Sequence, residues 1–231
     1  MSRKRPYITV VANQKGGSGK SVFSVNIAVE LSYKREEYTS LFRKKVKLTP
    51  SIPVLAIGLD PQNSLDSFNE MREIPNPHFV SASYNELKPI IEEATEKGYV
   101  HIVIDTPPHA HVANMDVLHV ADLIVIPSKQ GLFDADALNN DNVTNIILKK
   151  NHLFVPNMVR NAARAEDLRN YIQNSLEGSQ VSKTSVGLRT AFEDALLEGK
   201  SIAEFSPESE PGVQEIRELM KEIKRKLKNG S

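Results

Sequence analysis

Short apolar runs alternate along the chain with longer amphipathic stretches. The runs are rich in Val and Ile, as strands buried on both faces of a sheet are, and they lie at Tyr7–Ala12, Val54–Leu59, His101–Ile104, Leu123–Ile126 and Leu153–Val155. The stretches between and after them predict helices at Val22–Ser32, Glu86–Glu96, Ala135–Lys149 and Ala165–Leu176. Strands that alternate with helices predict an α/β fold with a doubly wound, mainly parallel sheet flanked by helices.

Two segments depart from this alternation. Val213–Lys228 predicts a last helix with its apolar positions on one face and its lysines mostly opposite. Lys34–Pro53 is polar, then basic, then proline-bearing, although a connection of a few residues would suffice there. We expect a single domain over 1–231 with an atypical basic insertion at about 34–53.

A glycine-rich loop follows the first predicted strand. Residues 13–21 read Asn-Gln-Lys-Gly-Gly-Ser-Gly-Lys-Ser and precede a predicted helix. Backbone N–H groups of such a loop, together with the helix N-terminus, bind phosphate. Lys20 is placed to reach the phosphates and the Ser21 hydroxyl to ligate Mg²⁺. Gln14 stands where the usual pattern has its first glycine, and a second lysine, Lys15, lies inside the loop.

Two carboxylates follow later predicted strands. Asp105 ends the run His101–Ile104, which is how a Mg²⁺-supporting aspartate is presented at a sheet edge. Asp60 ends the run Val54–Leu59, and a carboxylate near the γ-phosphate can orient the attacking water or accept its proton. An aspartate that caps a turn is the competing interpretation of each, and it is the stronger competitor for Asp60. Because ligands lie at the carboxyl ends of parallel strands, we expect both near the glycine loop.

Composition excludes several classes of protein. The chain has 231 residues and no cysteine, which rules out disulfides, thiolate metal sites and cysteine-held iron–sulfur clusters. It has no apolar run near the length of about 18 residues that a membrane span needs, so we expect a cytoplasmic protein. Net charge is zero, yet residues 1–50 carry 11 Lys/Arg and 3 Asp/Glu. That excess indicates either solvated loops or a surface that faces a polyanion.

Together these motifs resemble those of the ParA/MinD family of deviant-Walker P-loop ATPases. The resemblance rests on Lys15–Ser21, Leu59–Ser64 and Ile102–Pro108, with a weaker match from Arg189 to Phe205. It is closest to the small ParA-type proteins of plasmid partition. It implies a P-loop NTPase that binds ATP or ADP with Mg²⁺, forms a homodimer with ATP and hydrolyses ATP slowly.

The resemblance also implies roles for individual residues. The catalytic residues would be Lys15, which crosses to the ATP of the partner subunit, Lys20, which holds phosphates of its own subunit, Asp60 and Asp105. Mg²⁺ would be held by Ser21, Asp60 and, through water, Asp105, and Asp60 would also position the hydrolytic water. Nucleotide contacts would come from Lys15, Gly16, Gly17, Ser18, Gly19, Lys20, Ser21 and Val22, and adenine contacts from Asn157 and Pro207.

The partners implied by the resemblance are DNA, bound without sequence preference by the ATP dimer, and a ParB-like centromere-binding adaptor. Arg189 matches the DNA-contacting arginine of the family, and Lys200 and Arg217 are nearby candidates. The basic stretch Arg43–Lys47 either adds to this surface or is a solvated loop. Such a protein would be nucleoid-associated.

Other interpretations remain beside this one. A MinD-like positioning ATPase would lay its last helix on a membrane, but Val213–Lys228 has no aromatic residue, which favours a docked helix. A guanine-reading motif is not evident, since Ser128-Lys129-Gln130-Gly131 is not one, and dethiobiotin-synthetase-like ligases are not expected to carry Lys15. Metal ligation by His101, His109, His111 and His119 ranks below ordinary surface or loop histidines. Thr106–Met115 is expected to respond to the γ-phosphate.

Overall fold

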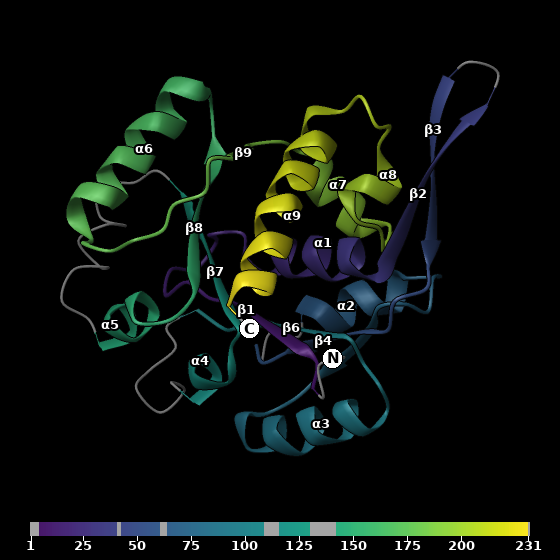
Figure 1. Cartoon of the computed structure of the whole chain (residues 1–231), viewed down its shortest axis with the longest axis horizontal. Coiled ribbons are helices and arrows are strands. Elements are labelled where there is room, and N and C mark those ends of the chain that lie inside the picture. The colour runs from purple at the N-terminus through teal and green to yellow at the C-terminus, as the bar shows by residue number, and fades with distance from the viewer. Residues whose placement is uncertain (1–4, 41–42, 61–63, 109–115, 130–141, 231) are drawn as a thin grey trace.

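The protein is built on one seven-stranded sheet whose paired strands all run parallel (Figure 1). The computed structural model describes residues 5–40, 43–60, 64–108, 116–129 and 142–230. The strand order is β5-β4-β6-β1-β7-β8-β9. The strands are β1 (Tyr7–Val11), β4 (Val54–Gly58), β5 (His78–Ser81), β6 (His101–Asp105), β7 (Leu123–Lys129), β8 (His152–Val159) and β9 (Val186–Gly187). The predicted α/β class is confirmed.

Helices cover both faces of this sheet (Figure 1). Successive residues of β1 point to opposite faces, so Val11 belongs to one apolar core and Val10 to the other. The first core is closed by α1 (Lys20–Ser32), α2 (Ser64–Met71), α7 (Ala191–Leu197), α8 (Ile202–Phe205) and α9 (Pro211–Asn229). The second is closed by α3 (Tyr84–Glu96), α4 (Asp116–Val120), α5 (Asn142–Leu148) and α6 (Ala162–Ser175).

Helix α1 is buried on almost every side. It lies between the sheet and the helices α2, α7 and α9, so that even Asn26 and Glu30 are inaccessible. Asn26 Oδ1 accepts a hydrogen bond of 2.9 Å from the backbone N–H of Ile202 and ties α1 to α8. The helix that follows the glycine loop is therefore held by packing and by a polar contact.

Most predicted elements are present, with shifted ends. Helix α1 begins at Lys20, two residues before the predicted start, and α3 carries the capping box between Ser83 and Glu86 that its sequence fits. Strand β8 runs from His152 to Val159, so placing Asn157 after that strand was wrong: it lies within it. Only Asn142–Leu148 of the helix predicted at 135–149 lies within the described residues as α5. Strands β5 and β9 were not predicted.

The segment predicted as a basic insertion is a two-stranded antiparallel ribbon. Strands β2 (Tyr33–Ser40) and β3 (Arg43–Pro50) pair from Tyr33 opposite Pro50 to Ser40 opposite Arg43. The ribbon is a separate sheet and extends away from the seven-stranded sheet (Figure 1).

The last helix, α9, docks on the body of the protein. Its apolar residues are all buried, namely Val213, Ile216, Leu219, Met220, Ile223 and Leu227. No helix in the described part of the chain is both long and apolar enough to span a bilayer.

Candidate nucleotide site

The loops after β1, β4 and β6, which carry the three motifs, begin side by side at the carboxyl edge of the sheet. Asp105 is the register partner of Val11 on β1 and of Gly58 on β4. The backbone N–H of Leu59 donates to the carbonyl of Asp105 at 3.0 Å. Because the three strands are adjacent and parallel, the glycine loop, Asp60 and Asp105 meet at the carboxyl edge of the sheet, where ligands bind in such folds.

The glycine loop has the backbone of a phosphate cradle. Gly17 and Gly19 adopt φ angles of 65° and 91°, in the left-handed region that side chains other than glycine rarely enter. Gly19 is the N-cap of α1, and no side chain caps the first turn of that helix. The loop and the start of α1 therefore present N–H groups and the positive end of the helix dipole to an anion.

Lys20 and Asp105 form the charged floor of the site. Lys20 is 6% exposed, and its Nζ donates to the carbonyl of Lys15 at 3.2 Å. Burial lowers the pKa of Lys20, and the charges of Asp105 and Asp60 oppose that change. These two carboxylates thus act on the same ammonium group, which places Asp60 in the site.

Asp105 is a buried carboxylate held by hydroxyls. It is 1% exposed, and its oxygens accept hydrogen bonds from Ser21 Oγ at 2.7 Å and Ser24 Oγ at 3.0 Å. Burial raises its pKa to about 6, although both serines and Lys20 favour the charged form. A desolvated carboxylate beside a serine hydroxyl is a fitting partner for a hard cation such as Mg²⁺.

These residues fit a magnesium nucleotide. Ser18, in the middle of the loop, is 1% exposed, and its Oγ has no hydrogen-bond partner within the described part of the chain. A buried hydroxyl without a partner is costly and indicates a polar ligand at that point. Ser21 and Asp105 are the residues that would hold Mg²⁺, and when bound the cation would neutralise charge on the phosphates.

Two side chains on neighbouring strands brace the loop, and the sequence alone did not reveal this. Asn157 Nδ2 donates to the carbonyl of Ser18 at 2.8 Å, and Lys129 Nζ donates to the carbonyl of Gly17 at 3.2 Å. Lys129 and Asn157 are register partners on β7 and β8. The fit is close, because a Cβ on Gly19 would lie 2.5 Å from Asn157 Nδ2. Neither Lys129 nor Ser24 was predicted; the three-residue spacing of Ser24 from Ser21 on α1 was the available signal.

A bulge in β8 lies beside this brace. The pairing of β8 with β9 shifts between Asn157 and Val159, and Met158 between them has a φ of 54°. Bulges re-aim side chains and are frequent next to functional sites. A strained Met158 beside the loop marks this end of β8 as part of the site. Contact of Asn157 with adenine stays a prediction.

The two lysines of the loop lie in different environments. Lys20 is buried as part of the floor of the site, whereas Lys15 is exposed. The backbone N–H of Lys15 donates to Asn13 Oδ1 at 2.8 Å, and Asn13 Nδ2 donates to the carbonyl of Pro127 on β7 at 2.8 Å. The backbone that carries Lys15 is thus fastened to the sheet while its side chain faces outward.

The predicted DNA-contacting cations lie away from the loop and are paired with carboxylates. Arg189, after β9, forms an ion pair with Glu215 of α9, and Arg217 of α9 pairs with Glu208. Lys200, between α7 and α8, donates to Glu198 at 2.7 Å. Pro207 lies in the exposed turn between α8 and α9. The roles assigned to these four residues remain predictions.

Some predicted features lie outside the described residues. These are Pro61–Asn63 after Asp60, and positions 109–115 of the segment expected to respond to the γ-phosphate, which hold His109 and His111. Of the other histidines, His101 is on β6 and stacks on Tyr7 with ring centroids 5.6 Å apart. Within the described residues no cluster of His, Cys, Asp or Glu has the arrangement of a metal site.

Two related proteins match almost the whole of this chain. It is 23% identical over 235 residues to the maintenance of carboxysome distribution protein A of Halothiobacillus neapolitanus, covering 96% of this chain and 99% of that protein. It is 24% identical over 261 residues to the sporulation initiation inhibitor protein Soj of Bacillus subtilis, covering 94% and 97%. No protein-family model matches the chain.

Solved structures share its fold. An ATP complex of McdA from Cyanothece superimposes with a TM-score of 0.63 at 16% identity, over 94% of this chain and 96% of that one. MinD of Pyrococcus horikoshii OT3 with Mg-ADP superimposes with a TM-score of 0.67 at 15% identity, over 98% of this chain and 99% of that one. A putative plasmid partition protein of Borrelia burgdorferi B31 with AMPPNP superimposes with a TM-score of 0.64 at 17% identity, over 96% of this chain and 100% of that one.

The parallel sheet, the glycine loop and the buried Lys20 and Asp105 define a P-loop nucleotide-binding protein. The loop also carries a second, exposed lysine, Lys15. The two related sequences match this chain over 99% and 97% of their own lengths. In its fold and in these motifs the chain is similar to MinD and to a ParA family ATPase of known structure.

Proposed function

We propose that this protein is a ParA-type ATPase that partitions a plasmid or other DNA-linked cargo by switching between a monomer and an ATP-bound dimer. The observation that carries the proposal is the contrast between its two loop lysines. Lys20 is 6% exposed and faces the carboxylates of its own site, whereas Lys15 is exposed beside the nucleotide site. An exposed cation at that point is suited to act on phosphates bound by a second subunit.

Each residue of the site has a role in this reaction. Lys20 and the loop N–H groups bind the phosphates of their own subunit. Lys15 of one subunit stabilises the charge that develops on the phosphates of the other, as an arginine finger does in trans. Asp60 orients the attacking water and accepts its proton. Lys129 and Asn157 hold the loop carbonyls, which keeps the loop N–H groups directed at the ligand.

The dimer would bind DNA without sequence preference, and hydrolysis would release it. A ParB-like adaptor would stimulate the otherwise slow hydrolysis. One related protein is named for carboxysome distribution and a similar structure for plasmid partition, which supports cargo positioning as the shared task. The apolar face of α9 is buried against the body, which favours this proposal over a membrane-bound MinD-like role.

The first test measures dimerisation and turnover. Wild-type protein should dimerise with ATP and Mg²⁺ and stay monomeric with ADP, as read by light scattering after gel filtration. Lys15→Ala should abolish turnover while ATP binding changes less than about threefold, because Lys20 and the loop of the same subunit remain. Lys88→Ala is a matched control, since Lys88 is an exposed lysine on α3 with an 88% exposed side chain. Full turnover by Lys15→Ala would contradict the role in trans.

The second test measures DNA binding with ATP, with ADP and without nucleotide, over a salt series. Binding should require ATP and weaken steeply with salt, because non-specific binding comes from phosphate contacts. Binding that ignores the nucleotide would refute the switch. Binding to anionic vesicles but not to DNA would favour the MinD-like alternative.

A further inference from the structure

The sequence of the β2–β3 ribbon carries an excess of positive charge. Residues 33–50 contain six Lys/Arg (Lys34, Arg35, Arg43, Lys44, Lys45 and Lys47) against Glu36 and Glu37. In the backbone register Lys47 lies opposite Glu36, but Arg43, Lys44 and Lys45 lie opposite Ser40, Thr39 and Tyr38. Residues directly opposite in an antiparallel pair interact most strongly. Three of the cations on β3 therefore have no acidic residue at the opposite position.

The C-terminal cations predicted to contact DNA are each paired with a carboxylate. Arg189, Arg217 and Lys200 each form an ion pair with a glutamate of the same chain. A phosphate that binds one of them must compete with that carboxylate, so the gain per contact is reduced. The side chain of Arg217 is also only 13% exposed.

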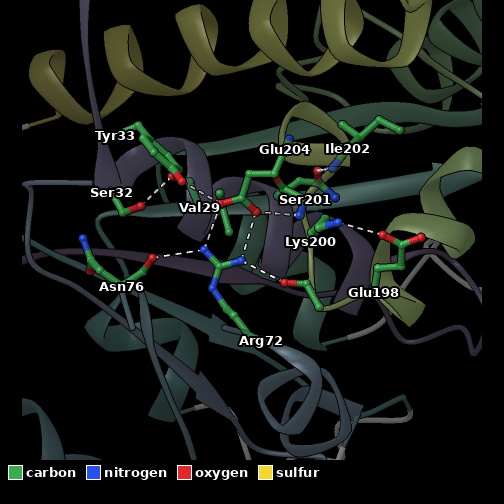
Figure 2. Close-up of polar contacts among 12 residues, drawn as sticks. Val29, Ser32, Tyr33, Arg72, Asn76, Glu198, Lys200, Ser201, Ile202 and Glu204 are labelled. Atoms are coloured by element: carbon green, nitrogen blue, oxygen red, sulfur yellow. Dashed lines mark hydrogen bonds and ion pairs between the residues drawn. The ribbon is translucent and has the colours of Figure 1, made fainter. Parts of the chain in front are cut away.

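The base of the ribbon is fastened to the body by a buried ion pair (Figure 2). Tyr33, the first residue of β2, donates its hydroxyl to Glu204 Oε1 at 2.8 Å. Arg72, with a 1% exposed side chain, donates to both oxygens of Glu204 at 2.9 and 3.0 Å. Directly after the other strand, the N–H groups of Ser51 and Ile52 both donate to the carbonyl of Ser32, at 3.1 and 3.0 Å. Both strands are thus anchored where they leave the body.

The contacts at its base fix the position at which the ribbon leaves the body of the protein. Tyr33 is oriented by Glu204, which Arg72 holds through two parallel hydrogen bonds, the geometry that fixes direction best. Burial and the bond to Glu204 raise the pKa of Tyr33, so its hydroxyl remains a donor. An arm that is held in place loses less entropy on binding than a free loop does.

The dimensions and charge of the ribbon suit duplex DNA. Eight residues per strand span about 25 Å at about 3.3 Å per residue, and the major groove admits a two-stranded ribbon. We propose that the β2–β3 ribbon is a DNA-binding arm and supplies more of the phosphate contacts of the protein than Arg189, Lys200 and Arg217 do. This inference rests on the DNA binding in the proposed function, and it assigns that binding to a different part of the chain.

The experiment compares two triple variants for binding to a fluorescent 30-base-pair duplex with a non-hydrolysable ATP analogue. One is Arg43→Ala/Lys44→Ala/Lys45→Ala. The other is Lys88→Ala/Lys149→Ala/Lys183→Ala, which removes exposed lysines elsewhere. With a salt slope of about −0.9 per phosphate contact, the slope of log K against log salt should be less negative by roughly 2 to 3 in the ribbon variant, and its affinity at 0.1 M salt should be roughly 100-fold lower. The control should change affinity less than about threefold.

A third variant, Arg189→Ala/Lys200→Ala/Arg217→Ala, tests the ranking and should lose less affinity than the ribbon variant. Unchanged nucleotide affinity and melting temperature show that each variant is folded. A shortened protein in which Asn-Gly joins Lys34 to Thr49 provides a second test, because these residues are opposite each other in register. Its DNA affinity and the salt dependence of that affinity should equal those of the ribbon variant.

The outcomes separate the two proposals. If wild-type protein binds DNA with ATP and the ribbon variant binds equally well with the same salt slope, the arm is refuted while the proposed function stands. If the C-terminal variant loses more affinity than the ribbon variant, the ranking is refuted. If wild-type protein shows no ATP-dependent DNA binding, both proposals fail. If the ribbon variant loses binding to anionic vesicles but binds DNA as wild-type protein does, the proposal that the ribbon is a DNA-binding arm is also refuted.

Discussion

Replacing Glu204 by alanine should destabilise this protein far more than the loss of a surface charge would. Arg72 directly follows α2 and is buried, with a 1% exposed side chain. Its guanidinium donates to Glu204, to the carbonyl of Gly199 at 3.0 Å and to the carbonyl of Asn76 at 3.1 Å. Glu204→Ala removes the carboxylate that pairs with this guanidinium, and Tyr33 loses its acceptor as well.

The magnitude follows from burial. Breaking a buried pair by removing one partner costs about 3–5 kcal/mol, because the other charge stays desolvated. The pair of Lys88 with Glu92 on α3 is a matched comparison, with side chains 88% and 66% exposed and a separation of 4.0 Å. Exposed pairs of this spacing contribute about 0.3–0.5 kcal/mol. Since domains are stable by only about 5–15 kcal/mol, Glu204→Ala should remove a large fraction of the total.

The assay is urea unfolding followed by circular dichroism, with Glu92→Ala as the control. The expected loss of unfolding free energy is about 3–5 kcal/mol for Glu204→Ala and below about 0.5 kcal/mol for the control. The double variant Arg72→Met/Glu204→Leu should recover most of the loss, since apolar replacements leave no buried charge. A loss below about 1 kcal/mol for Glu204→Ala, or no recovery in the double variant, would refute the reasoning.

Three further predictions concern the nucleotide site and the sheet. Asn157→Ala removes one hydrogen bond to the loop and should weaken ATP binding roughly 3- to 10-fold by calorimetry; unchanged affinity would rule out the brace. Gly19→Ala should abolish ATP binding because its Cβ would lie 2.5 Å from Asn157 Nδ2, whereas Gly178→Ala, with a similar φ of 81° and nothing within 4 Å, should bind normally. Burial and the charge of Lys224 lower the pKa of His101 to about 4, below the value of about 6.5 in an unfolded chain. At His101 the unfolded chain therefore binds more protons between these values, so the contribution of His101 to stability should fall by up to about 3 kcal/mol as pH falls from 6.5 to 4, while Asp105, whose pKa is raised to about 6, contributes in the opposite direction. Compared with wild type, His101→Phe should lose less stability, or gain more, over this pH range in urea unfolding; an identical pH dependence would contradict the role of His101.

The parts of the fold that sequence predicted are those with strong local signals. The strands on which the glycine loop, Asp60 and Asp105 lie are continuous apolar runs, because both faces of a central parallel strand are covered. The capping box of α3 was recognisable for a similar reason, since its two residues are only three positions apart.

The elements that sequence missed lack such signals. Strand β5 has four residues at the edge of the sheet, and β9 has two. The β2–β3 ribbon is a sheet separate from the seven-stranded one. Polar and apolar positions alternate only over Lys45–Thr49 in β3, and β2 shows no such alternation, so the sequence did not indicate a pair of strands. Only the backbone pairing shows that the basic segment is a ribbon.

The site divides in the same way. Sequence alone identified the glycine loop, its extra Lys15 and the carboxylates Asp60 and Asp105 as the candidate site, because their predicted chemistry depends on residue type and on position directly after a strand. Only the tertiary structure decided what surrounds that loop. Lys129 and Asn157 reach it because the strand order sets β7 and β8 beside β1, and Glu204 meets Arg72 across more than a hundred residues of chain. These contacts depend on how the sheet is ordered and how the helices pack, and no local pattern in the chain encodes either.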